Sequence, residues 1–272
     1  PNTYSAVVVA LSYLIDPDTP KNAGTFRPLT LIARPGTVVW ANPGAPVTLA
    51  TNHCGQEIVE AVIKALAPAC PDRAMAGWGR RFRIAIQGRD PRPDVPGGRP
   101  FIWHFFQARP GGGASPAGDG WPGGGEWQAA GGIKFGSLEV TEVRFPLFFR
   151  RHEFRPDSGG AGQYRGGPGG IVEMVVETAE PAQANTAGDG VRHGACGILG
   201  GADGMPHRYI LHSAGRDPRP IRTKETGLVI RPGDRLVLES GGGGGWGDPR
   251  RRDPAARDRD RDSGFVGAAA KA

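Results

Sequence analysis

The residues whose types and spacing could support chemistry are most concentrated between Arg155 and Gly167, where two arginines flank an Asp-Ser pair and several glycines. A glycine-rich turn can present backbone N–H groups to an anion, and arginine binds carboxylates and phosphates through paired hydrogen bonds. The block therefore suggests a site for an anionic group. Its candidate residues are Arg155, Ser158, Gly159, Gly160 and Arg165.

The same block also has a purely structural interpretation, as a rigid connection. Asp157 would then cap the turn or pair with an arginine, and the glycines would let backbones approach closely. Because glycine-rich turns serve packing more often than ligand binding, the residues alone favour this second interpretation. In either case we expect residues 155–167 to be ordered and at least partly buried, since fixing clustered glycines requires compensating contacts.

Two of the six histidines stand where they could take part in catalysis or metal binding. His53 lies beside Cys54 at the start of an expected helix, where thiolates and anions are favoured, and it is the candidate metal ligand. His104 follows Trp103, upstream of a glycine-rich loop that carries Asp119. A buried, hydrogen-bonded histidine is the commoner outcome, and no histidine shows a recognisable metal-ligand spacing.

Large aromatic side chains lie in and around this loop. They could line an aromatic substrate pocket, or they could anchor an interface with a partner protein. The residues concerned are Trp103, Phe105, Phe106, Trp121 and Trp127.

Composition and missing signatures exclude several functions. No glycine is followed by lysine, so there is no P-loop, and neither H-E-x-x-H nor G-x-S-x-G occurs. The net charge of +6 comes from dispersed arginines, and the densest run, Arg250–Asp262, is interleaved with aspartates. We therefore predict no nucleic-acid partner, which would need a continuous basic face. The lack of a bilayer-length apolar run predicts no membrane partner, and three cysteines without paired spacing favour a cytoplasmic protein.

The elements that position these residues indicate an α+β fold, with two N-terminal helices followed by a β-rich, Gly/Pro-rich region. Thr3–Ile15 is an apolar segment expected to form the first helix, and Asp16-Pro17 ends it. The helical part covers about residues 1–72 and the β-rich part about 80–249, whereas 250–272 is expected to be an extended charged arm or tail that tolerates trimming. The second helix is predicted by an apolar stripe of Ile58, Val62, Ile63 and Leu66.

Short apolar runs between glycine and proline clusters predict the strands. Leu138–Phe154 is expected to hold one or two strands around Pro146, and short extended pieces are expected at Leu29–Ala33 and Thr37–Trp40. The remaining predicted strands are Phe82–Gln87, Phe101–Gln107, Ile171–Glu177, Tyr209–His212, Gly227–Ile230 and Arg235–Glu239.

The Arg155–Gly167 block resembles the R-P-D-S-G-G-A-G-x-x-R-G-G signature of the hydantoinase B/oxoprolinase family. Four other blocks resemble family motifs and occur in the family's order. Pro20–Leu29 resembles P-x-N-x-G-x-x-R-P-L, Gly111–Gly120 resembles G-G-x-G-A-x-x-x-D-G with one glycine shifted or missing, Gly197–Gly204 resembles G-L-x-G-G-x-x-G, and Gly241–Pro249 resembles G-G-G-G-x-G-D-P. Five blocks in order are hard to obtain by accident, so residues 1–249 resemble the C-terminal half of a B-type subunit.

The resemblance implies a component of an ATP-dependent complex. Family members include hydantoinases, 5-oxoprolinases and acetone- or acetophenone-type carboxylases, in which an actin-like A-type subunit uses ATP and the B-type part completes hydrolysis or carboxylation. ATP and a divalent metal (Mg, Mn or Zn) are thus the implied cofactors. They would be bound mainly by the A-type partner and by a chain carrying the N-terminal half of the B-type subunit, where the family keeps its metal-binding motifs.

Within such a complex, the chain is expected to form part of a cavity for a small-molecule substrate and to dock the ATP-using partner. Asp119, His104 and Asp157 are then the candidate catalytic residues, and Arg155 and Arg165 would organise the cavity wall. The alternative is a purely structural assembly subunit with no catalytic residues of its own. On either hypothesis the chain alone is expected to be inactive, because it contains no readable set of nucleophile, base and orienting residue.

Overall fold

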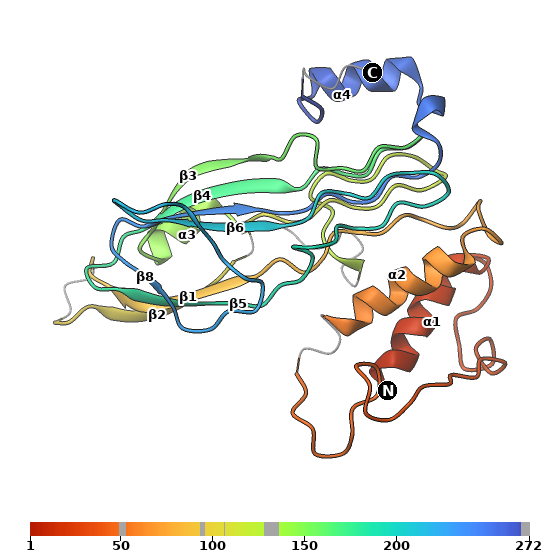
Figure 1. Ribbon diagram of the computed structural model, residues 1–272, viewed down its shortest axis with the longest axis horizontal. Coiled ribbons are helices and arrows are strands. Elements are labelled where there is room, and N and C mark those ends of the chain that lie inside the picture. Colours follow the sequence, from red (N-terminus) through yellow and green to blue (C-terminus); the bar gives the residue numbers. More distant parts are fainter. Residues whose placement is uncertain (49–52, 93–95, 106, 128–135, 268–272) are drawn as a thin grey trace.

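The structure, a computed structural model, describes residues 1–48, 53–92, 96–105, 107–127 and 136–267 of the 272-residue chain. It confirms the α+β fold, with two helices first and then two antiparallel sheets (Figure 1). No helix among the described residues has the length and apolar character needed to cross a membrane. The helices are α1 (Asn2–Leu14), α2 (Cys54–Leu66), α3 (Leu138–Arg144) and α4 (Pro254–Asp262), with a 3₁₀ turn, η2, at Pro249–Arg251. The strands are β1 (Ile84–Asp90), β2 (Arg99–His104), β3 (Leu147–Phe154), β4 (Gly170–Val176), β5 (Ala182–Thr186), β6 (Arg208–His212), β7 (Arg219–Pro220), β8 (Leu228–Ile230) and β9 (Arg235–Glu239).

The two sheets stack face to face. Their strand orders are β2-β1-β5-β8 and β3-β4-β9-β6-β7, and Figure 1 shows the second sheet above the first. Alternate residues of the strands point between the sheets, as in any pleated strand with one buried face. Ile84 and Ile86 from one sheet and Met174, Leu236 and Leu238 from the other meet in a single buried core.

One expected strand assignment differs from the structure, and two observed strands, β5 and β7, were not expected. Residues Leu138–Arg144 form α3, because the Ser137 side chain accepts a hydrogen bond from the Val140 N–H and caps a short helix. The β propensity of the valines in this segment is a weak signal without packing. The sequence also failed to indicate β5, whose alternation is carried by alanines as well as polar residues.

The helices α1 and α2 pack against each other beside the sandwich and form a second core with Trp78 and Trp127. A buried ion pair joins them to the rest of the chain. Glu60 of α2 accepts two hydrogen bonds from Arg80, at 2.7 and 2.6 Å, and one from the Cys196 N–H at 3.1 Å. This contact sets where the helical part lies on the remaining structure.

Beyond the ends of β4 and β9, extended segments run alongside one another without forming a sheet (Figure 1). We call residues 76–79, 110–114, 120–125, 158–169, 195–204 and 241–246 the glycine bundle. The segment 241–246 exchanges backbone hydrogen bonds with four of the others, through their residues Gly77, Ala114, Gly160 and Ala202 among others. A strand in a flat sheet has two neighbours, so the bundle packs in three dimensions rather than in a layer.

This packing explains why its segments are rich in glycine. A Cβ on Gly243 would lie 1.9 Å from the Gly112 carbonyl oxygen, and one on Gly244 would lie 2.0 Å from the Cys196 oxygen. Successive residues of 241–245 thus face different neighbouring segments, and none of these five glycines has room for a side chain. The same restriction places glycine at the crowded axis of a triple helix of extended chains. Four of the five family-like blocks contribute segments to this bundle.

Candidate functional site

Arg155 is buried at the end of β3, and its guanidinium group is engaged within the chain. It donates to the carbonyl oxygens of Pro206 (2.7 Å) and Ser240 (3.2 Å) and pairs with Glu239 at 3.2 Å. The neighbouring Ser158 hydroxyl donates to the Arg155 carbonyl at 2.6 Å and accepts from the Gly169 N–H at 2.9 Å. These contacts anchor the end of β3 to the strands beside it.

Gly159 and Gly160 serve the close approach of backbones. A Cβ on Gly159 would lie 2.0 Å from the Gly166 oxygen, and one on Gly160 would lie 2.1 Å from the Ala202 oxygen. The Gly160 N–H donates to the Gly243 carbonyl at 2.8 Å. The expectation that this block is partly buried is confirmed, and the close approach of its glycines to other backbone matches that part of the structural interpretation.

Arg165 belongs to a buried network of alternating charges. Its Nε lies 3.0 Å from Asp260, which also accepts from Arg252 at 2.6 Å, and Arg252 pairs with Asp119 at 2.7 Å. Burial alone would raise the pKa of Asp119, but the hydrogen bonds from Arg252 and from the Arg165 N–H hold it below its usual value. Asp119 is therefore an ionised partner of arginines rather than a group ready to donate a proton.

The C-terminal segment that supplies Arg252 and Asp260 contains the mostly exposed helix α4, so it is helical in part and not extended throughout; within residues 250–267 only these two side chains are buried. Asp157 holds the part of it that follows α4. The backbone of Asp157 is left-handed, with φ of 60°, its N–H donates to the Phe265 carbonyl, and its side chain accepts from the Gly267 N–H at 3.0 Å. The carboxylate thus neither caps its own turn nor pairs with an arginine among the contacts described. Aspartate tolerates this backbone region better than most residues.

The two histidines considered from the sequence belong to different parts of the fold. His104 is the last residue of β2, opposite Ala85 in the four-stranded sheet, and none of the described contacts of Asp119 involves it. His53 precedes α2, and its Nδ1 contacts the carboxylate of Asp189, which also pairs with Lys224. Among the described contacts, no hydrogen bond or ion pair joins the proposed catalytic residues His104, Asp119 and Asp157.

The described residues show no cluster that would hold a divalent metal within this chain. No three His, Cys, Asp or Glu side chains in that part of the chain come together as a metal-binding group, and Nδ1 of His53 contacts Asp189.

The aromatic residues do not form one pocket. Trp103 and Phe105 belong to the core between the sheets, and Trp127 packs on Trp78 and Tyr13. Trp121 is largely exposed, and Phe106 lies outside the described residues. The substrate-pocket interpretation is not supported for these side chains as a group.

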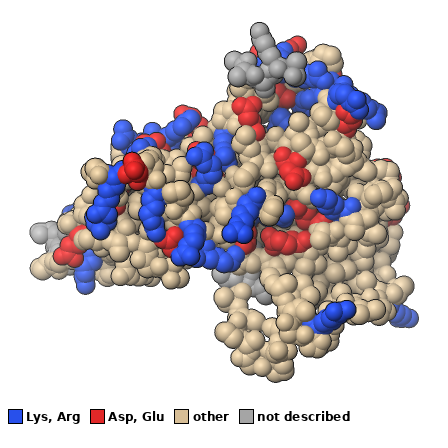
Figure 2. Space-filling view, viewed as in Figure 1, with Lys and Arg blue, Asp and Glu red and all other residues tan. Residues whose placement is uncertain are grey.

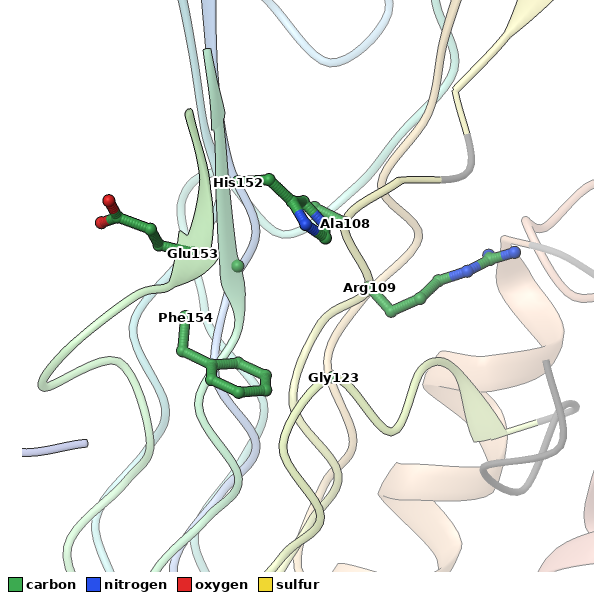
Figure 3. A pocket seen from close by; sticks show the side chains of 7 residues that line it. Ala108, Arg109, Gly123, His152, Glu153 and Phe154 are labelled. Carbon is green, nitrogen blue, oxygen red and sulfur yellow. The ribbon is translucent and has the colours of Figure 1, made fainter. Parts of the chain in front are cut away.

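A cavity of about 290 Å³ does open at the end of β3, beside Arg155. His152 and Phe154 extend from β3 on one side, and Glu153, which also lines the cavity, extends on the other side (Figure 3). The opposite wall includes Ala108 and Gly123, and the guanidinium of Arg109 leads away from His152. The cavity thus combines an aromatic ring, an imidazole, a carboxylate and backbone.

The orientation of His152 follows from one hydrogen bond. Its Nε2 lies 2.6 Å from the Gln107 carbonyl oxygen, and because a carbonyl can only accept, Nε2 must carry the proton. In the neutral ring Nδ1 is then a hydrogen-bond acceptor or a base. The sequence analysis missed this residue. The signal that could have found it is the period-two spacing of His152 and Phe154 directly before the Arg155 block, which places both on one strand face.

Comparison with known proteins gives a consistent result. The family model described as hydantoinase B/oxoprolinase matches residues 1–249. Caprolactamase subunit beta of Pseudomonas jessenii is 33% identical over 275 residues, which cover 97% of this chain and 46% of the relative. The 5-oxoprolinase of Saccharomyces cerevisiae is 26% identical over 253 residues, which cover 90% of this chain and 19% of the relative. This chain therefore spans less than half of the curated relatives it matches.

Solved structures show the same fold. The crystal structure of the ATP-dependent caprolactamase from Pseudomonas jessenii superimposes with a TM-score of 0.80 at 28% identity, over 97% of this chain and 46% of that one. A nucleotide-free acetone carboxylase has a TM-score of 0.80 at 20% identity, over 98% of this chain and 39% of that one, a likeness of fold alone. The glycine bundle and the sandwich beside it are thus shared with larger chains.

Proposed function

Because this chain belongs to the hydantoinase B/oxoprolinase family, we propose that it is part of the B-type component of an ATP-dependent complex that hydrolyses a cyclic amide or carboxylates a ketone. The observation that carries the proposal is the likeness to subunit beta of an ATP-dependent caprolactamase along 97% of this chain. Hydrolysis of an amide is favoured over carboxylation, because the acetone carboxylase shares the fold at lower identity.

The chain contributes one wall of the substrate cavity and the frame that holds it. Arg155 fixes the end of β3 through Pro206, Ser240 and Glu239, and the side chains of His152 and Phe154 extend from that end into the cavity. A wall of this kind suits a small, mostly apolar ring with one polar group. The imidazole of His152 would contact that polar group from the wall.

ATP and the divalent metal of the complex are bound by other polypeptide. The sequence has no P-loop, and the described residues offer no metal-binding group. The A-type ATP-binding subunit and a chain carrying the N-terminal half of the B-type subunit are the proposed partners. This chain docks the former and completes the cavity of the latter.

A second candidate function is that of an assembly subunit without a catalytic role. One observation favours it: Arg155 and Arg165, the most promising groups in the sequence, are both buried in contacts within the chain. The two functions differ in what they predict for His152, which lies in the cavity and has no part in the glycine bundle.

The test is made on the reconstituted complex, with phosphate release and product measured for hydantoins, lactams including caprolactam, 5-oxoproline, and aryl ketones with bicarbonate. We expect His152→Ala to lower turnover by about tenfold or more with assembly unchanged, in line with the loss of one acid–base or positioning group. The matched control is Arg150→Ala, on the same strand, exposed, and not among the residues that line the cavity. Equal activity of the two variants would favour the assembly function.

The chain alone is expected to release no phosphate from ATP and to form no product from the same substrates. Turnover by residues 1–272 alone, at a rate close to that of the complex, would contradict the division of roles proposed for the partners.

A further inference from the structure

The connection between α1 and α2 carries apolar side chains that nothing in the described structure covers. Ile32 is 90% exposed, Val38 82% and Val47 70%, and Trp40 is half exposed. We call residues 29–48 the arm; it extends away from both sheets at the bottom of the view in Figure 1. Connections this long without helix or strand are uncommon in a compact domain, and clustered exposed apolar groups mark sites of association.

Part of the arm is an extended segment with free backbone groups. Among the described contacts, no backbone hydrogen bond involves Thr30, Leu31, Ile32 or Ala33. Such a segment presents N–H and C=O groups along both edges, which is the arrangement that adds as a strand to the open edge of another sheet.

The arm is nevertheless held in place at both ends of this segment. The Leu29 N–H donates to the Phe26 carbonyl at 3.0 Å, and a tight turn pairs Thr37 with Trp40. The Thr3 hydroxyl of α1 donates to the Val39 carbonyl at 2.5 Å and ties that turn to the helix. A strand presented in this way loses less conformational freedom on binding than a loose tail would.

The charge of the arm limits what it can bind. Arg34 is its one charged residue, and Figure 2 shows the lower part of the molecule as largely uncharged, whereas basic and acidic side chains are interspersed over the rest of the visible face. A complementary surface is therefore a sheet edge flanked by an apolar groove, neutral or with an acidic group opposite Arg34.

We propose that residues 30–33 add as a strand to a sheet edge of the polypeptide that supplies the part of the B-type relatives not spanned by this chain. This inference rests on the proposed function. It is supported by the coverage of the relatives: this chain corresponds to 46% of caprolactamase subunit beta, so in that relative more than an equal length of chain is available to pack against the arm. Ile32 and Val38 then fill the apolar groove beside the new strand.

The experiment uses the complex purified through a tag after Ala272, with the companion chain identified by mass spectrometry as matching the B-type family outside the region covered here. Hydrogen exchange is compared between the free chain and the complex. Because the N–H groups of a strand alternate between its two edges, we expect exchange at either residues 30 and 32 or residues 31 and 33 to slow by at least tenfold on assembly.

Three substitutions and one control test the apolar side chains and the backbone N–H groups of the arm separately. Ile32→Asp should weaken binding of the companion by at least tenfold, whereas Val143→Asp, at a 79% exposed position on α3, should change it less than twofold. Thr30→Pro and Ala33→Pro each remove one N–H, on opposite edges of the strand, without breaking a described backbone bond. Only the proline variant that replaces a residue whose N–H is protected in the complex should weaken binding of the companion.

Each contrary result has a defined meaning. An active complex in which residues 30–33 exchange freely, or in which Ile32→Asp binds as well as the unchanged chain, overturns this inference and leaves the proposed function standing. Equal loss for both proline variants overturns strand addition, as does protection of the arm by a second copy of this chain or by the ATP-using subunit. If no B-type companion is found, both the inference and the proposed function fail.

Discussion

At the scale of single residues, the arginines of the Arg155 block show how a residue suited to anion binding can be committed to structure. The guanidinium of Arg155 joins β3 to β9 and to the segment before β6, and that of Arg165 holds α4. Each buried arginine meets a carboxylate or several carbonyl oxygens, as a buried charge must. Activity should therefore respond to these residues through the geometry of β3 and not through direct substrate contact.

His207 gives a pH-dependent prediction at the same scale. It is buried, its Nδ1 accepts from the Gly241 N–H, and its Nε2 donates to the Arg80 carbonyl at 2.9 Å, so the ring is held neutral. Burial lowers its pKa from 6.5 to about 3. Between these two values the unfolded chain therefore binds more protons than the folded chain does. The contribution of neutral His207 to folding stability is complete above pH 6.5 and should be lost progressively as the pH falls towards 3.

The measurement is thermal unfolding from pH 7.5 to 4. The control is His207→Asn, which keeps an acceptor for the Gly241 N–H but does not titrate, and its unfolding temperature should fall less steeply with acidification. Parallel curves for the two proteins would show that His207 does not cause the acid sensitivity.

At the scale of elements, the packing of the glycine bundle predicts that alanine substitutions at two adjacent glycines differ greatly in their effect on the free energy of unfolding. A Cβ on Gly113 would lie 2.0 Å from the Ala76 carbonyl oxygen, whereas one on Gly112 would come no closer than 3.2 Å to the Trp121 nitrogen. Gly113→Ala should lower the free energy of unfolding by about 3 kcal/mol or more, because backbone must move apart, and Gly112→Ala by about 1 kcal/mol or less. Urea unfolding of both variants measures the difference, and similar losses would contradict the close packing of the bundle.

We predict that the charged side chains of the C-terminal helix α4 stabilise the chain. This differs from the expectation that trimming of residues 250–272 is tolerated. Asp260→Asn leaves Arg165 and Arg252 buried with less compensation, which should cost on the order of 3 kcal/mol and speed trypsin cleavage within α4. Asp262→Asn, at an exposed position of the same helix, is the control. Removal of residues 250–272 should lower the unfolding temperature as well; if it does not, the network has no effect on stability.

At the scale of the whole molecule, a buried ion pair links α2 of the second hydrophobic core to Arg80, which lies between Trp78 of that core and Phe82 of the first. Glu60→Gln should cost about 3–5 kcal/mol, because Arg80 keeps its charge in a buried position. We expect hydrogen exchange to become faster in α1 and α2 and to stay unchanged in β4 and β9. Glu57→Gln is the matched control, since Glu57 lies 3.9 Å from the same arginine and is partly exposed. Equal exchange in the two variants would show that other contacts join the cores.

What the sequence by itself determined is local. The apolar stripe of Ile58, Val62 and Ile63 predicted α2, and short apolar runs between glycine and proline clusters predicted β4 and β9, because these signals depend on neighbours a few residues apart. The glycine blocks, read as a set, identified the family. They also favoured a structural role for the Arg155 block, since repeated glycines indicate that backbone segments approach closely. They do not identify which segments these are.

Only the tertiary structure decided which groups these residues meet. Arg165 pairs with Asp260, Arg252 with Asp119, and His53 with Asp189, across separations of 95, 133 and 136 residues. The type and spacing of side chains along the chain carry no information about partners so distant. The cavity at His152 is hidden for the same reason, because its walls come from β3 and from loops that approach it only after the glycine bundle has packed.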